Sequence, residues 1–158
     1  MPYIIKPVFR KPRYQNALRA MAVLLCGCAS QTPAPYSMAA DDSRAALACM
    51  LPTQCVNSFE GNSPGPMRFS GTATQALALL RATLAEFPEA KLLKAEGMTL
   101  EVVFTTPLGF RDLVDFRIDA QAQRIDYRSR SSFGLFDFGK NRSRMTAFLD
   151  RFERLAKR

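Results

Sequence analysis

Residues 124–144 read R-I-D-Y-R-S-R-S-S-F-G-L-F-D-F-G-K-N-R-S-R, and this stretch decides the fold. Near its start, Ile125 and Tyr127 alternate with charged residues, a period of two that is typical of a strand with one covered face and one exposed face. Two glycines further along then indicate a loop. A helix is expected to begin near Asn141. The stretch therefore predicts a strand, a loop and the first turn of a closing helix.

Segments on either side of this stretch predict the rest of the domain. Thr72 and Gln75 form a capping box ahead of leucines at helical spacing, so a helix that ends at Pro88 is expected. The closing helix should run to about Lys157 with an apolar stripe on one face. Further strands are predicted over residues 67–70, 90–95, 98–105 and 113–118. This order predicts the α+β class: an antiparallel sheet of four to five strands with two helices packed on one face.

The first 27 residues carry most of the net positive charge. They contain five basic residues and no acidic one, whereas the whole chain has 22 basic and 14 acidic residues. The remainder has 17 basic against 14 acidic residues, a net charge of +3. Nucleic acid is therefore not expected as a partner, despite the overall charge of +8. Basic residues followed by the apolar run 20–25 are typical of a secretory signal peptide, predicted here over residues 1–27.

Leu25-Cys26-Gly27-Cys28 resembles the lipobox of bacterial lipoproteins. The resemblance implies cleavage before Cys28 and acylation of its thiol and of its new amino group. Several acyl chains anchor a protein stably, whereas a single chain does so only marginally. Ala29, rather than an aspartate, follows this cysteine, which implies sorting to the outer membrane. We expect a lipid-anchored protein of the bacterial cell envelope that faces the periplasm. The alternative is a cytosolic protein with a basic, disordered arm.

Residues 28–45 are predicted to be the lipidated cysteine and a flexible tether. Proline, serine, alanine and threonine are frequent in this stretch, and such a composition cannot bury enough apolar surface to fold. The chain is thus expected to consist of a signal peptide (1–27), the lipidated cysteine with its tether (28–45) and a single α+β domain (46–158).

Cys49 and Cys55 are the two other cysteines, and we expect them to form a disulfide. An exported protein meets an oxidising compartment, where one bridge around Pro52 is the simplest use of two nearby thiols. The entropy of loop closure gives this bridge a worth of about 2 kcal/mol. The spacing lacks the C-x-x-C pattern of redox proteins, and two cysteines supply too few ligands for a metal. Two free thiols are the alternative.

The chain contains no histidine. This absence excludes Ser-His-Asp triads, Cys-His nucleophiles, histidine zinc sites and histidine pH switches. Asp137-Phe138-Gly139 matches the metal-binding triplet of kinases, but the other kinase motifs are missing from the sequence. We therefore predict a protein that is not an enzyme and that holds no cofactor and no metal.

Three patches of the sequence carry a resemblance. They are Gln54-Cys55-Val56-Asn57-Ser58, preceded by Cys49; residues 110–119; and residues 128–144, which follow the pattern R-S-x-S-R-x-G-x-x-D-x-G-x-N-R-x-R. By these patches, the chain is similar to the bacterial domain of unknown function 1499 family over residues 49–155. Ser132 and Leu113 depart from the family pattern, which has arginine and aspartate at these positions. The resemblance implies no assigned activity.

The third patch is a candidate anion-binding site. Its arginines come in two pairs, one on the strand and one in the first helical turn, where free backbone amides favour an anion. A phosphate, a carboxylate or a lipid head group would suit them. The alternative is structural: nearby aspartates (Asp115, Asp126, Asp137) pair with the arginines, and Asn141 caps the helix. The candidates are Arg128, Arg130, Arg142 and Arg144, with Gly134, Asp137, Gly139 and Asn141 shaping the loop and the cap.

The expected function is that of a non-catalytic structural or binding module of the cell envelope. Its expected partner is the membrane, through the lipid anchor. An anionic phospholipid head group or a glycan is the further candidate, bound through the arginine-rich loop and the helix N-terminus.

Overall fold

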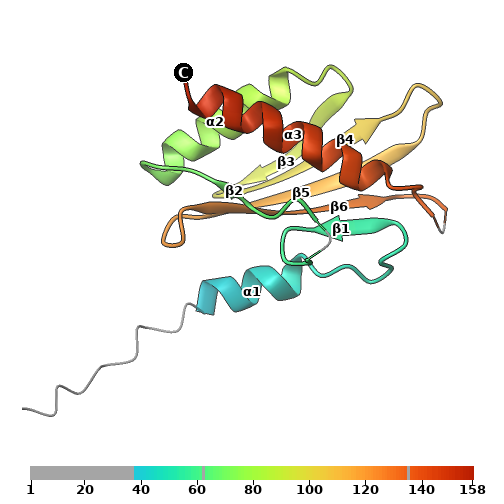
Figure 1. The fold of residues 1–158 in the computed structure, drawn as a ribbon, viewed down its shortest axis with the longest axis horizontal. Helices are drawn as coiled ribbons and strands as arrows, with labels where there is room; N and C mark the ends of the chain where they lie inside the picture. Colours follow the sequence, from blue (N-terminus) through green and yellow to red (C-terminus); the bar gives the residue numbers. More distant parts are fainter. Residues whose placement is uncertain (1–37, 62, 135) are drawn as a thin grey trace, which may run out of the picture. The chain divides into compact units, whose positions relative to one another are not determined.

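The structure is a computed structural model of the chain and describes residues 38–61, 63–134 and 136–158. The predicted signal peptide, the lipobox and Cys28 lie outside these residues. Ser37–Arg158 cluster as one compact unit, which contains the hydrophobic core formed by the described residues and the disulfide (Figure 1).

Strands and helices follow one another in an order that confirms the α+β class. The elements are α1 (Met38–Ala46), β1 (Cys55–Asn57), β2 (Met67–Arg68), α2 (Ala73–Ala85), β3 (Ala90–Glu96), β4 (Thr99–Thr105), β5 (Arg111–Asp119), β6 (Arg124–Ser131) and α3 (Lys140–Ala156).

The described strands form one antiparallel sheet of six, more than the four to five expected. The order is β1-β6-β5-β4-β3, and β2 also pairs with β6. The unexpected strand is β1, whose three residues are too few to show a period of two. It forms because its backbone pairs with β6, from Cys55 opposite Arg130 to Asn57 opposite Arg128. Pairing with a distant strand, rather than local pattern, therefore defines this edge of the sheet.

Helix α1 overlaps the predicted tether (28–45) in all but its last residue. Its composition is poor in large apolar residues, but Ser43 and Leu47 are buried against the rest of the unit. The Arg117 guanidinium also donates to the Asp42 backbone carbonyl at 3.3 Å and forms an ion pair with its carboxylate at 3.4 Å. Tertiary contacts thus hold a helix that composition alone did not predict.

The core lies between the sheet and two of the helices. Figure 1 shows α2 and α3 along one side of the sheet and α1 along the other. Alternate side chains of β4, β5 and β6 enter this core and meet the apolar stripe of α3. The buried side chains include Leu100, Val102, Phe104, Val114, Phe116, Ile118, Ile125 and Tyr127 from the strands and Ala76, Leu80, Met145, Phe148 and Phe152 from the helices.

Two local predictions are confirmed. The Gln75 amide donates to the Thr72 hydroxyl at 3.2 Å while the Gln75 side chain accepts from the Thr72 amide at 2.8 Å, so the capping box starts α2 as expected. Cys49 and Cys55 form the expected disulfide, with their Cα atoms 5.7 Å apart. Among residues 38–158, apart from 62 and 135, no helix is long and apolar enough to cross a membrane.

Candidate functional site

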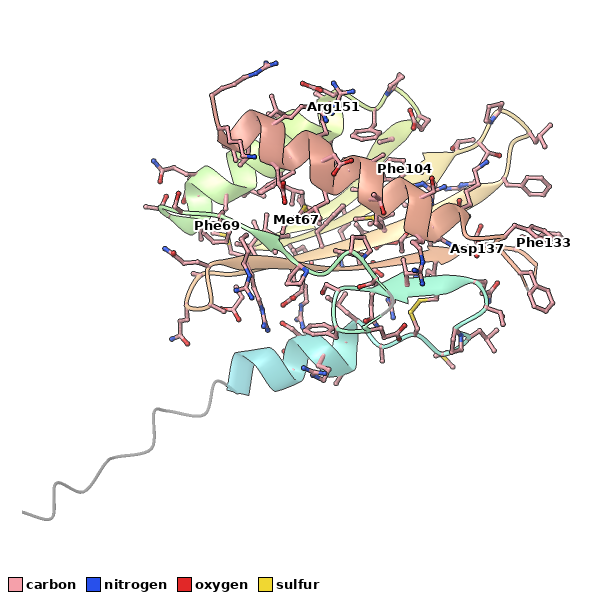
Figure 2. All side chains as sticks on the ribbon, in the orientation of Figure 1. Met67, Phe69, Phe104, Phe133, Asp137 and Arg151 are labelled. Atoms are coloured by element: carbon pink, nitrogen blue, oxygen red, sulfur yellow. A yellow bond between two sulfur atoms is a disulfide. The ribbon has the colours of Figure 1, made fainter. Side chains whose placement is uncertain are left out.

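Three chain segments that are distant in sequence meet at one end of the sheet. They are the disulfide loop (Cys49–Cys55), the β4–β5 loop (106–110) and the β6–α3 loop (132–139), and we call this region the loop end. A backbone hydrogen bond joins the disulfide loop to the β6–α3 loop, since the Asp137 amide donates to the Thr53 carbonyl at 3.2 Å. The Ser132 amide donates to the carbonyl of Arg111, the residue directly after the β4–β5 loop, at 3.1 Å. Figure 2 shows Phe133 and Asp137 at this end. The three loops thus lie together at one end of the β-sheet.

Large apolar side chains of the loop end face solvent. Leu108 is 83% exposed, Phe133 78% and Phe138 98%. Phe110 and Phe136 are exposed as well, and all five side chains line one hollow of about 560 Å³. Single exposed apolar residues are ordinary on protein surfaces, whereas large contiguous apolar patches are typical of interaction sites.

Phe138 is held in an unfavourable backbone conformation. Its φ is 53°, in the left-handed region, and that of Gly139 is 76°. The left-handed region costs a residue with a side chain about 1–2 kcal/mol. The Asp137 carboxylate fixes this geometry, because it accepts from the amides of Gly139 and Asn141, each at 2.9 Å. Strained positions of this kind cluster at functional sites.

Two cations flank the apolar side chains. Arg111 and Lys140 line the same hollow and are exposed. In the part of the chain that the structure describes, neither side chain forms an ion pair or a hydrogen bond. The two acidic residues of the hollow are occupied: Asp112 pairs with Arg144, and Asp137 holds backbone amides. The loop end therefore presents unneutralised positive charge beside apolar surface.

A second hollow of about 570 Å³ lies next to the first. It shares Thr106, Pro107 and Lys140 with the first hollow and continues toward Phe87 and Phe104. The two hollows together extend the apolar surface of the loop end from the β4–β5 loop to the N-terminal turns of α3.

The four candidate arginines do not converge. Arg128 donates to the Asp115 carboxylate at 3.0 and 2.7 Å from two nitrogens, and Arg130 lies 3.9 Å from the same oxygen. Ser129 stands between them on β6 and points to the opposite face, where its hydroxyl donates to Asn141 at 2.7 Å.

Arg144 lies on that opposite face. It pairs with Asp112 and donates to the Asn141 side-chain oxygen at 2.8 Å. Arg142 is exposed and forms no ion pair with any described residue. The two arginines on the strand and the two on the helix are thus separated by the sheet. The four side chains therefore do not form a single anion-binding site. The alternation along β6 indicates that Arg128 and Arg130 share a face, but it does not indicate which face α3 covers.

The structural alternative is correct for one aspartate and wrong in its details. Asp115 pairs with Arg128 as expected, but Asp126 pairs with Arg124 at 3.0 Å. Burial raises the pKa of Asp126 above its usual value, although Arg124 and the Ser58 hydroxyl oppose the shift. Asp137 binds backbone amides rather than an arginine.

Asn141 is not the helix cap. It lies within the first turn of α3, fully buried, and its amide group donates to the Gln54 carbonyl at 3.0 Å and to the Ser131 hydroxyl at 3.2 Å. Gly139 is the N-cap residue of α3, and the carboxylate of Asp137, two residues earlier, accepts from the Asn141 amide. Asn141 instead joins α3 to β6 and to the disulfide loop, and Gly134, at a φ of 90°, turns the loop between them.

Metal ligands do not gather in the described ranges, where no group of three or more cysteine, aspartate or glutamate side chains could hold an ion.

The fold and the loop end together define an α+β domain with an apolar, cation-flanked surface. The chain belongs to the family described as "Protein of unknown function (DUF1499)", whose model matches residues 29–152. This match confirms the resemblance found in the sequence. No curated protein matches the chain.

Proposed function

We propose that this protein is a lipid-anchored, non-catalytic binding module of the bacterial cell envelope, and that the loop end is its binding surface. Residues 1–27 would be removed, and Cys28 would carry the lipid on the periplasmic side of the outer membrane. The observation that carries the binding role is the exposure of Leu108, Phe133 and Phe138 beside unpaired cations.

The disulfide supports a location outside the cytosol. Structural disulfides persist in oxidising compartments such as the periplasm and are rare in the cytosol. The Cys49–Cys55 bridge closes the disulfide loop, which in turn accepts the amide of Asp137. The bridge therefore fixes one of the three segments of the proposed binding surface.

The loop end supports binding more than a purely structural role. A structural module would gain nothing from displaying apolar side chains to water, because burial of such surface is worth about 25 cal/mol per Å². The strained backbone at Phe138 also supports a binding role, because the fold holds an aromatic ring outward at a cost in free energy. A partner that covers these side chains would recover that free energy.

Binding of an anion by all four arginines is not favoured by the geometry. Arg128 and Arg144 already satisfy carboxylates on opposite faces of the sheet. Positive charge for an anionic phospholipid head group or glycan is available instead from Arg111 and Lys140.

Lipid labelling in cells tests the anchor. We expect radioactive palmitate to label the wild-type protein in the outer-membrane fraction and the label to be lost in Cys28→Ser. Cys26→Ser is the matched control and should keep the label. Labelling of Cys28→Ser equal to that of the wild type would contradict the anchor.

Photo-cross-linking in intact cells tests the binding role. A photoreactive amino acid at position 138 should give adducts in the envelope, whether with lipid, glycan or protein. The same amino acid at position 92, on β3, is the control and should give few. Equal yields at both positions would remove the loop end as the binding surface.

A further inference from the structure

The loop end is shaped by projecting loops rather than by a flat face or a deep cleft. Leu108, Phe133 and Phe138 come from the tips of two loops, and each is exposed over most of its surface. A folded protein partner needs a surface that matches such projections closely. The fluid interface of a bilayer adapts to them, and apolar side chains enter it by about 5–10 Å.

Several backbone groups of these loops are already hydrogen-bonded within the loops. In the β4–β5 loop, the Thr106 amide donates to the Phe110 carbonyl and the Gly109 amide to the Thr106 carbonyl, both at 2.8 Å. The Phe110 amide donates to the Thr106 hydroxyl at 3.1 Å. An unsatisfied backbone group costs several kcal/mol in a lipid environment, so this internal pairing lowers the cost of placing the loop in the interface.

Part of the β6–α3 loop is hydrogen-bonded in the same way, next to its exposed rings. The Lys140 amide donates to the Asp137 carbonyl at 3.0 Å, and the Asp137 carboxylate accepts from two amides. These bonds occupy the oxygens of the Asp137 carboxylate, which keeps its negative charge. Because Asp112 is paired with Arg144, the two cations Arg111 and Lys140 exceed the one remaining anion, Asp137, and the charge around the apolar side chains is net positive.

We propose that the loop end binds the surface of an anionic bilayer, with Phe133 and Phe138 entering the interface and Arg111 and Lys140 meeting the lipid phosphates. This inference rests on the proposed binding role of the loop end and names its partner. Charge complementarity selects an anionic surface, because each cation near such a surface gains about fivefold in binding.

Sedimentation with vesicles tests the apolar contribution. The unit Ser37–Arg158 is used because it contains the whole core and the disulfide but not Cys28, so no acyl chain contributes. It should bind vesicles of mixed phosphatidylglycerol and phosphatidylcholine. Phe133→Ser/Phe138→Ser should bind at least about tenfold more weakly. Leu92→Ser/Leu93→Ser changes exposed side chains of β3 and should bind like the parent unit.

The same assay tests the charges. Arg111→Gln/Lys140→Gln should weaken binding to mixed vesicles about 25-fold, equivalent to about 2 kcal/mol. Arg81→Gln/Lys91→Gln removes two exposed cations elsewhere and should bind like the parent unit. All four residues are exposed, so we expect neither double substitution to disturb the fold. Thermal unfolding that matches the parent unit checks this expectation.

Absence of binding by the parent unit, or equal losses in the loop and control variants, would overturn the bilayer as the partner. Cross-linking from position 138 then separates the two proposals. Adducts with a protein or a glycan would leave the binding role standing without the bilayer. Absence of adducts as well as of vesicle binding would end both.

Discussion

At the scale of single residues, Asn141 joins several of the segments that build the loop end. Its buried side chain bonds to Ser129, Arg144, Gln54 and Ser131, which come from β6, α3 and the disulfide loop. An alanine there would leave several buried polar groups without partners, and each such group costs about 1–3 kcal/mol.

We therefore predict that Asn141→Ala lowers the free energy of unfolding by about 2–4 kcal/mol, measured by urea denaturation. Ser143→Ala, in the same turn of α3 but exposed, is the control and should change it by less than about 0.5 kcal/mol. Similar effects of the two substitutions would show that Asn141 does not join the elements as described.

Phe138 combines a strained backbone conformation with an exposed aromatic side chain. Because its φ of 53° is strained for a residue with a side chain, Phe138→Gly should raise the free energy of unfolding by about 0.5–1 kcal/mol. Phe136→Gly is the matched control: Phe136 is exposed in the same loop without a positive φ, so its replacement should give no gain. A loss of stability in Phe138→Gly would mean that the ring is kept for packing rather than for a partner.

Tyr127 gives the protein a pH dependence in the alkaline range. Burial raises the pKa of its hydroxyl from 10.0 to about 12. The folded state therefore holds this proton more tightly than the unfolded state does, and the resulting stability is complete below pH 10 and is lost as pH rises toward 12. We expect wild type to lose about 2–3 kcal/mol more than Tyr127→Phe across this range in denaturation experiments. Parallel pH profiles would contradict the raised pKa.

At the scale of elements, the predictable parts are those whose signal is local. The capping box at Thr72 and the alternation in β4 identified their elements without tertiary information, and the stripe containing Phe148 identified α3. Helix α1 and strand β1 were not predicted from the sequence, because contacts with distant residues hold them, such as the contact of Arg117 with Asp42.

The candidate site was predictable in composition but not in arrangement. Residues 128–144 did contain the loop and the first turn of α3 that build one side of the loop end. Sequence did not reveal that the sheet separates Arg128 from Arg144, because this depends on the face that α3 covers. The aromatic residues of two loops were missed as a group, since their proximity arises from the pairing of β5 with β6.

The disulfide is the element-scale feature that ties the N-terminal part of the unit to β1. Removing it in Cys49→Ser/Cys55→Ser should lower the free energy of unfolding by about 2 kcal/mol, because the unfolded chain regains the entropy of an open loop. Urea denaturation under oxidising conditions measures the change. Addition of a reductant should then lower the stability of the wild type and leave that of the variant unchanged; a loss in both would assign the effect to something other than this bridge.

At the scale of the whole molecule, the sheet gathers three loops at one end and leaves their apolar side chains open. Asp112 is paired with Arg144 and the Asp137 carboxylate binds backbone amides, so the two cations Arg111 and Lys140 outnumber the one unpaired anion and give this surface a net positive charge. An anchor at Cys28, as proposed, would keep that surface near lipid in the cell. The central claim is that the loop end is a binding surface for a bilayer.

Tryptophan fluorescence tests that claim most directly, because the chain contains no tryptophan and a single introduced one reports its own surroundings. In Phe138→Trp, we predict that anionic vesicles shift the emission to shorter wavelength and that brominated acyl chains quench it. Leu93→Trp on β3 should show neither change. Emission from position 138 that stays the same with and without vesicles, or that changes equally at position 93, would contradict the account.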